Sequence, residues 1–354
     1  MIKDFQPNGL PTLLGSLPID AHDAAAELVF KYTPDIPVWA QLPGFPHEGM
    51  VPQFLPGIPG LAKKNDSMFV DTASPNFDSD LLAFYEEYIA VQEGEIDLYN
   101  SRFILTKDVA EGFFVFLDRL KHLSGPPAAV KGQITGPITF CLGLTDQNER
   151  AVFYNETLRD AAVKLLAQKA RWQAKKLGNF GCPVLIFLDE PAMAGFGSSA
   201  FISISGDEVS TCLEEVIAAV HAEGGLAGIH VCSNTDWSLI LESSVDVVSF
   251  DAYSHFDRFI LYADQIRDFL ESGRIIAWGI VPTGNPEDIE KETTDSLVAG
   301  WEEKAQQVRA LGFDNRQLVA QSLITPSCGT GSLSLDLATK VLTLTDEVSL
   351  RIRS

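Results

Sequence analysis

Short apolar runs recur along the chain and alternate with longer stretches in which apolar and polar positions follow a helical period. Apolar runs without polar alternation are typical of strands that are buried on both faces of a parallel sheet. The stretches between them have the length and period of amphipathic helices that cover such a sheet. The pattern therefore predicts an α/β fold with eight strands, at residues 12–17, 37–42, 128–135, 183–189, 226–232, 245–251, 275–281 and 317–324.

A helical pattern follows each predicted strand, and this repeated order of strand and helix predicts a closed (β/α)8 barrel, known as a TIM barrel. A doubly wound open sheet is the alternative, but no G-x-G-x-x-G motif follows the first strand. The helices are predicted at residues 21–32, 78–97, 107–122, 149–178, 207–223, 235–242, 257–271, 287–311 and 334–352.

One segment interrupts this alternation of strands and helices. Residues 43–60, with the sequence PGFPHEGMVPQFLPGIPG, are too rich in Pro and Gly for regular structure. Because they follow the second strand, we predict an insertion over the top of the barrel, with a short hairpin near residues 69–72. No linker or internal repeat divides the chain, so residues 1–354 are expected to form a single TIM-barrel catalytic domain.

Composition narrows the class of protein. Hydrophobic residues make up 46% of the 354 positions and charged residues 21%, which is typical of a globular domain in solution. The formal net charge of −22 and the lack of a basic patch disfavour nucleic-acid binding. No segment has the pattern of a signal peptide or a membrane span. Five scattered cysteines argue against a disulfide framework and for a reducing, cytoplasmic location.

Potential metal ligands follow the carboxyl ends of three predicted strands, the end at which TIM barrels carry their active sites. His230 and Cys232 are two residues apart, so their side chains point to the same face of a strand. Asp251 ends the sixth strand, and Cys328 follows the eighth. These nitrogen, sulfur and oxygen donors form a typical tetrahedral zinc set. Two buried thiols, a core histidine and a helix-capping aspartate are the alternative.

The remaining histidines and cysteines are weaker candidates. His47, in the insertion, and His255, after the sixth strand, could face the site or support it. His22 and His221 lie in helical patterns, and we expect them on the surface or in packing roles. Cys141, Cys182 and Cys212 have no further donors nearby, and we expect them to be structural.

Six short motifs resemble a known family when they are taken in order. TLLGSLP, QITGPIT, FLDEPA, HVC, SFDAY and TPSCG are similar to motifs of the carboxy-terminal catalytic barrel of cobalamin-independent methionine synthase. That barrel is related to uroporphyrinogen decarboxylase and to zinc methyltransferases that use corrinoid proteins. The resemblance covers nearly the whole chain and implies a methyltransferase that forms methionine.

The resemblance also implies roles for individual residues. Zinc would be held by the His230–Cys232 pair, by Cys328 and by a carboxylate at Asp251, where the full synthase has Glu. The backbone of Gly15 and Ser16 and the carboxylate of Asp189 would bind the amino-acid part of homocysteine, which makes Asp189 the catalytic-site carboxylate. A tight turn at residues 15–16 and a buried, helix-capping Asp189 remain the structural alternatives.

The chain departs from this family on the side that binds folate. The full synthase has two barrels, whereas this chain has the length of one. The family's folate-stacking Trp is absent from residues 136–143, a Glu is replaced within 193–195, and a proton-donating His is missing from 279–286. We therefore predict that the methyl donor is a methylated corrinoid protein or methylcobalamin rather than a folate. Two alternatives are a zinc methyltransferase with another thiol acceptor, such as coenzyme M, and a metal-free decarboxylase or binding protein on the same barrel.

Overall fold

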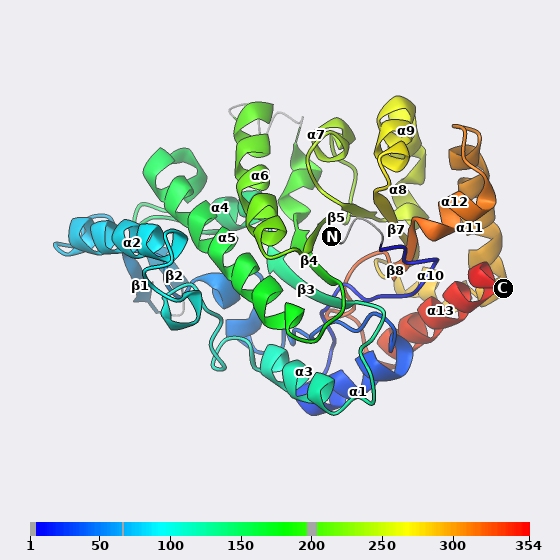
Figure 1. Ribbon diagram of the computed structural model, residues 1–354, viewed down its shortest axis with the longest axis horizontal. Coiled ribbons are helices and arrows are strands. Elements are labelled where there is room, and N and C mark those ends of the chain that lie inside the picture. The colour runs from blue at the N-terminus through cyan, green and yellow to red at the C-terminus, as the bar shows by residue number, and fades with distance from the viewer. Residues whose placement is uncertain (1–4, 66, 197–203) are drawn as a thin grey trace.

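A computed structural model describes residues 5–65, 67–196 and 204–354. Residues 1–4, the start of the N-terminal segment in which no signal-peptide pattern was found, lie outside the described residues. A curled sheet of six parallel strands, in chain order, occupies the centre of the described molecule, with helices on its outer face (Figure 1). Its strands are β3 (Val130–Thr135), β4 (Val184–Asp189), β5 (Leu226–Val231), β6 (Val247–Phe250), β7 (Ile275–Val281) and β8 (Ser322–Pro326).

Two N-terminal segments lie along the open edges of this sheet. Residues 11–16 form an isolated parallel bridge to β8, and residues 38–41 form one to β3. A third bridge, between Ser16 and Gln41, joins the two segments to each other. They occupy the places of the first two predicted strands but do not form continuous ladders. Gly15 contributes to the interruption, because its φ of +138° departs from strand geometry.

Helices connect the strands and cover the sheet. None among the described residues is long and apolar enough to cross a membrane. They are α1 (His22–Tyr32), α2 (Phe77–Gln92), α3 (Glu111–Lys121), α4 (Pro137–Gly143), α5 (Glu156–Gly178), α6 (Gly206–Ala222), α7 (Trp237–Leu241), α8 (Ala252–Phe259), α9 (Ala263–Glu271), α10 (Pro286–Lys291), α11 (Thr294–Arg309), α12 (Asn315–Ala320) and α13 (Leu335–Arg353).

The structure corrects several predicted boundaries. The first part of the strand predicted at 317–324 is helical, because Asp314 accepts a hydrogen bond from the Gln317 backbone and starts α12 with a capping box. The helix predicted at 287–311 is two helices, and Thr293 caps the second one in the same way. The pattern at 257–271 also divides into two helices, α8 and α9. The short helix α4 was not predicted, since a seven-residue apolar segment lacks a clear period.

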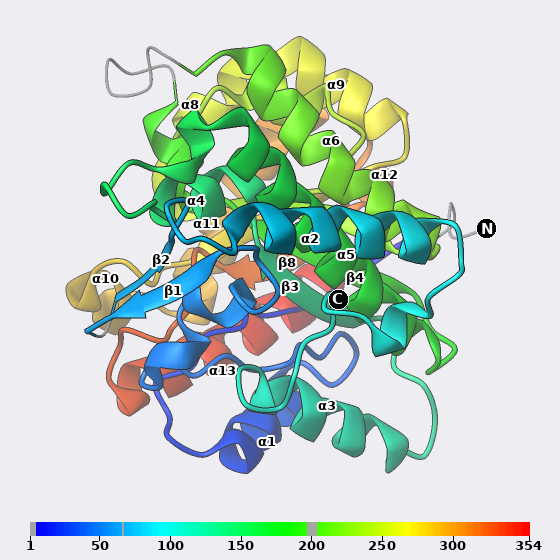
Figure 2. The same ribbon diagram turned by 90° about the vertical axis from the view of Figure 1, so that its left-hand side faces the viewer.

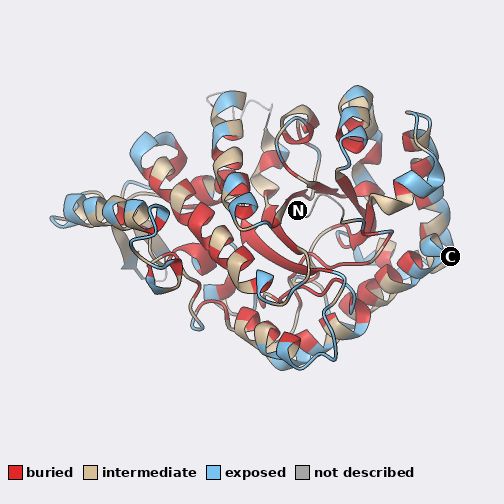
Figure 3. Ribbon diagram, viewed as in Figure 1, coloured by how far each residue is buried: buried red, intermediate tan, exposed pale blue. Residues whose placement is uncertain are grey.

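The interior of the curled sheet has an apolar floor and a polar upper part. Buried residues concentrate on the strands and on the helix faces turned toward them (Figure 3). Toward the C-terminal ends of the strands the buried residues become polar, with Gln133, Thr135 and His230 among them. This end is therefore suited to chemistry. The floor is an apolar cluster of Leu14, Ile36, Ala129, Leu185, Phe187, Val247, Ile275, Ala277 and Leu323.

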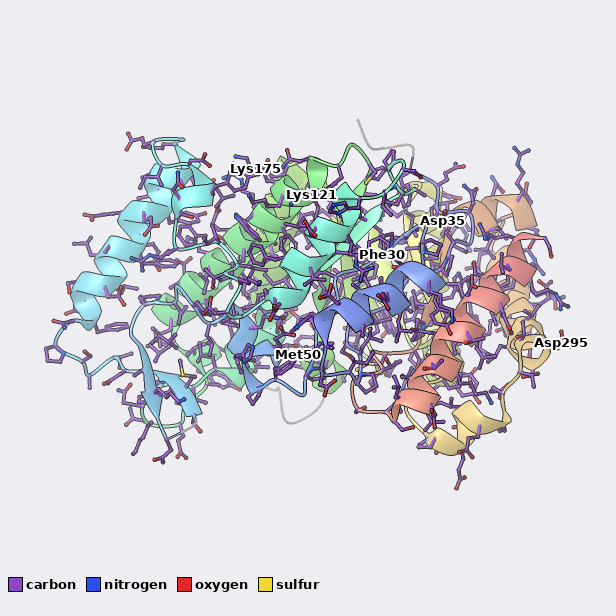
Figure 4. All side chains as sticks on the ribbon, turned by 90° about the horizontal axis from the view of Figure 1, so that it is seen from below. Phe30, Asp35, Met50, Lys121, Lys175 and Asp295 are labelled. Atoms are coloured by element: carbon purple, nitrogen blue, oxygen red, sulfur yellow. The ribbon has the colours of Figure 1, made fainter. Side chains whose placement is uncertain are left out.

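The Pro- and Gly-rich segment 43–60 is tied to the sheet and to α1 by polar contacts. Glu48 accepts hydrogen bonds from the His22 side chain at 2.7 Å and from the Leu42 backbone at 2.8 Å. The Thr135 hydroxyl, at the end of β3, donates to the carbonyl of Met50 at 2.6 Å. Met50 is labelled in Figure 4. These contacts hold the segment over the C-terminal ends of the strands.

An antiparallel hairpin of β1 (Leu61–Lys64) and β2 (Ser67–Val70) follows this segment, a few residues before the position predicted for it. The hairpin lies beside α2 at one end of the molecule (Figures 1 and 2).

Candidate metal and substrate site

Three of the predicted metal ligands meet at the C-terminal ends of the strands. His230 belongs to β5, Cys232 follows that strand, and Cys328 follows β8. One donor atom from each lies within 4.8 Å of the other two. The chain reaches this arrangement because β5 and β8 are parallel and therefore end on the same side of the sheet.

His230 presents an unpaired ring nitrogen in this cluster. Its Nδ1 lies 3.0 Å from the hydroxyl of Ser249 on β6, whereas its buried Nε2 has no hydrogen-bond partner among the described residues. Burial lowers the pKa of His230 to about 3, and the charge of Lys131 acts in the same direction. The imidazole is therefore neutral at physiological pH and has a lone pair available for a metal.

The two thiols complete a donor set that fits zinc. Both are free, and the hydrogen bond to Cys328 lowers the pKa of Cys232 to about 7. The same interaction and burial raise the pKa of Cys328, so the pair favours one thiolate stabilised by the other thiol. One imidazole nitrogen and two sulfurs are the ligands that zinc prefers in proteins.

Asp251 is not part of the three-residue cluster. Its side chain accepts a hydrogen bond from the Ser254 backbone at 2.8 Å and caps the N-terminus of α8. Asp251 as a whole is 8% exposed, so this capping residue is nearly buried. The structure thus brings together three of the four predicted ligands, while Asp251 has the capping role that the alternative interpretation gave it.

A cavity of about 140 Å³ adjoins the cluster. Pockets for drug-sized ligands usually have about 300–1,000 Å³, so this one suits a small metabolite. Two of the residues predicted to bind substrate, Ser16 and Asp189, share this cavity with the three candidate ligands. Its walls are formed by Leu14, Ser16, Gln41, Met50, Asp189, Pro191, His230, Cys232, Cys328 and Gly329.

Asp189 contributes an unsatisfied acceptor to the cavity. Its Oδ1 is buried and has no hydrogen-bond partner among the described residues. Burial raises the pKa of Asp189 to about 7, while the charge of Lys131 opposes this effect. A buried carboxylate oxygen without a donor is costly, so a bound cationic donor would stabilise it.

The turn at Gly15 and Ser16 packs against the loop that holds Cys328. The Ser16 carbonyl accepts from the Thr330 backbone at 3.0 Å, and the Ser16 hydroxyl accepts from the Gly331 backbone at 3.2 Å. A side chain at Gly329 would lie 2.1 Å from the Ser16 hydroxyl, so only glycine fits there. The turn at residues 15–16 and the loop of Cys328, both candidate parts of the site, are therefore positioned by the same contacts.

The structure adds residues that the sequence analysis did not assign. Ser249 contacts the ring of His230. Its position two residues before Asp251 places both side chains on the same face of the strand, and this spacing could have identified it. Gln41 lines the cavity at the end of the second predicted strand. Glu190, next to Asp189, instead holds the start of α4 by accepting from the backbones of residues 138 and 139 at 2.9 and 2.8 Å.

His47, which the sequence left as a candidate, does not line the cavity beside the cluster of His230, Cys232 and Cys328. It lines a separate cavity of about 660 Å³ between the Pro-rich segment and the hairpin of β1 and β2.

The comparisons with known proteins support the fold. No sequence family and no curated protein matches the chain. The fold is similar to that of a B12-independent methionine synthase from Shewanella sp. W3-18-1, solved in complex with selenomethionine. That similarity has a TM-score of 0.55 and 16% identity over 97% of this chain and 98% of the other. A GH5-4 broad specificity endoglucanase from Clostridium acetobutylicum has a TM-score of 0.33 and 10% identity over 64% of this chain and 88% of the other.

Proposed function

We propose that the chain is a zinc-dependent methyltransferase that transfers a methyl group to the thiol of homocysteine and forms methionine. The observation that carries this proposal is the buried, unpaired Nε2 of His230 beside two thiols, in a small cavity that also contains Asp189. The similarity in fold to a methionine synthase over nearly the whole chain supports it.

We propose that the complete architecture is a (β/α)8 barrel. The isolated bridges of residues 11–16 and 38–41 link the two edges of the six-stranded sheet and support this view. The single domain would then include the insertion that ties Met50 to the end of β3.

His230, Cys232 and Cys328 would hold the zinc ion, and we retain Asp251 as the proposed fourth donor. A bound zinc ion would lower the pKa of an incoming thiol, ordinarily about 8.5, so that the thiol reacts as a thiolate. Of these four residues, Asp251 offers the hardest donor, so an incoming thiolate would displace it most easily. Ser249 keeps the Nε2 of His230 available by occupying its Nδ1.

The rest of the cavity would bind the amino-acid part of the substrate. The unpaired Oδ1 of Asp189 would accept a hydrogen bond from the substrate ammonium. The backbone turn of Gly15 and Ser16, on another wall, would receive the carboxylate. The similar methionine synthase was solved with selenomethionine, which carries the same two groups, and this supports the assignment.

For the methyl donor we propose a methylated corrinoid protein or methylcobalamin. The chain lacks the Trp, the Glu and the His that the family has on its folate side. A methyl group on folate nitrogen needs a protonated leaving group, whereas one on cobalt does not. Loss of a general acid should slow the folate reaction by about 10²–10⁴-fold. The similar protein is described as B12-independent, so support for the corrinoid donor comes from the sequence alone.

Metal analysis is the first test. The wild type, purified without added zinc, should carry one zinc ion per chain, and Cys232→Ser and Cys328→Ser should lose it. Cys141→Ser, which changes a buried thiol in α4, is the matched control and should keep it. A metal-free wild type would instead support the decarboxylase or binding-protein alternative.

A methyl-transfer assay then identifies both substrates. Methylcobalamin and methyltetrahydrofolate are compared at equal concentration, each with homocysteine and with coenzyme M. We expect methionine from methylcobalamin and homocysteine. Turnover with the folate alone would reject the corrinoid donor, and turnover with coenzyme M alone would reject the amino-acid acceptor.

A further inference from the structure

Lys131 is a fully buried cation beneath the cavity, and the proposed reaction has not yet given it a role. It lies on β3 with 0% exposure, and its Nζ donates to the carbonyl of Leu14 at 2.9 Å. The Nζ also lies 4.4 Å from the ring centroid of Phe187, although the Lys131 backbone pairs with Leu185. The side chain therefore extends along the barrel toward the strand ends.

Asp189 is the counter-charge toward which this side chain extends. It follows Phe187 by two residues on β4, so both side chains point to the same face of the strand. No carboxylate of the described residues lies within 4.0 Å of the Lys131 Nζ in an ion pair, and Asp189 is the charged group that raises the pKa of Lys131 against its burial. The two buried charges thus balance each other at longer range.

The hydrogen bond of Lys131 connects it to the second part of the proposed substrate site. Leu14 lines the cavity and immediately precedes the Gly15–Ser16 turn. Because the carbonyl of Leu14 is held by Lys131, the entry into the turn is fixed from below. One side chain therefore acts on both walls that would bind the amino-acid group.

We propose that Lys131 is a positioning residue for the thiol substrate: it fixes the turn at residues 15–16 through the Leu14 carbonyl and balances the carboxylate of Asp189 from beneath the cavity. This inference rests on the proposed function, because the two walls matter only for an acceptor with an ammonium and a carboxylate. It predicts that Lys131 affects the recognition of those groups and leaves zinc binding unchanged.

The chain offers a matched control in Lys169. This lysine, on α5, is also fully buried, and its Nζ donates to the carbonyl of Ile104 at 3.0 Å. Burial lowers its pKa to about 7, and no carboxylate of the described residues adds to this effect. Replacement of either lysine by Met removes a buried cation bound to one carbonyl, but only Lys131 lies beneath the cavity.

The experiment measures zinc content, thermal unfolding and KM for two thiols in the wild type, Lys131→Met and Lys169→Met. Homocysteine carries both charged groups, and propane-1-thiol carries neither. For Lys131→Met we expect KM for homocysteine to rise by about 10–100-fold, the range for losing one charge-assisted contact. KM for propane-1-thiol and the zinc content should not change. Lys131→Arg, which keeps the charge, should recover part of the affinity for homocysteine.

Three results would overturn the inference: an unchanged KM for homocysteine in Lys131→Met, an equal loss with propane-1-thiol, or an equal loss in Lys169→Met. If Lys131→Met does not fold, Lys131→Gln carries the same test, because it retains a donor and removes the charge. A wild type that does not use homocysteine rejects the proposed function as well. A wild type that uses homocysteine, with Lys131→Met unchanged, rejects only the role of Lys131.

Discussion

Replacement of Ser249 by Ala should weaken zinc binding although Ser249 is not a ligand. Ser249 is fully buried on β6, pairs with His230 in the strand register, and places its hydroxyl 3.0 Å from Nδ1. Without the hydroxyl, the ring loses the contact that fixes its orientation and its protonated nitrogen. Loss of such an outer contact typically reduces metal affinity by about 10–100-fold, equivalent to about 1.4–2.7 kcal/mol.

The variant should also unfold more easily, because Nδ1 is left buried without a partner at a cost of about 1–3 kcal/mol. A second buried serine separates the two effects. Ser349 on α13 donates to the Gly9 carbonyl at 2.7 Å, so Ser349→Ala removes a buried hydroxyl contact outside the cluster. Ser349→Ala should lower stability and leave zinc affinity unchanged.

The assay is competition with a chromogenic chelator at fixed pH, since protons compete with zinc for His and Cys. A zinc affinity of Ser249→Ala within about twofold of the wild type would refute the reasoning, as this lies below the range for a lost outer contact. An equal decrease in Ser349→Ala would refute it as well, because the effect would then follow stability.

Three further predictions concern substrate binding, the substrate turn and a surface ion pair. Asp189→Asn should raise KM for homocysteine about 10–100-fold and retain zinc; unchanged kinetics would exclude ammonium binding. Gly15 has a φ of +138°, and a Cβ there would lie 2.8 Å from Gln133 Nε2, whereas Gly273 has a φ of +83° in open space. In denaturant titrations, Gly15→Ala should therefore lower the free energy of unfolding by about 1–3 kcal/mol more than Gly273→Ala. The hydrogen bond to Asp246 raises the pKa of His221. The pair is partly exposed, so it should stabilise the fold by less than about 1 kcal/mol. This stabilisation should be present below about pH 6.5 and fade at higher pH. His221→Gln should remove this difference between unfolding curves at about pH 6 and pH 8.

Local pattern was sufficient to predict β3 to β7 and to place two candidate ligands on one strand. The apolar runs that became β4 and β7 are continuous, and burial on both faces of a parallel sheet produces that pattern directly. The His230–Cys232 pair follows from the period of two along β5. Cys328 joins them because parallel strands end on one side of the sheet, which is a property of the fold class. These features depend on neighbours in sequence or on general rules of architecture.

The sequence did not determine which polar side chain serves which purpose. Asp189 and Glu190 are adjacent, yet one faces the cavity and the other holds the start of α4. Asp251 has the residue type and position of a ligand, and in the packed structure it also accepts from the Ser254 backbone and caps α8. These outcomes depend on which partner atoms the packed helices bring within reach.

Tertiary structure alone assigned Lys131. In the sequence it interrupts an apolar run, and its period on β3 indicates only that it is buried. Its partner Leu14 is 117 residues away, and Asp189 is on the neighbouring strand. A buried charge is tolerated only where distant segments supply a carbonyl and a counter-charge, so its role depends on the tertiary fold and not on the residues beside it.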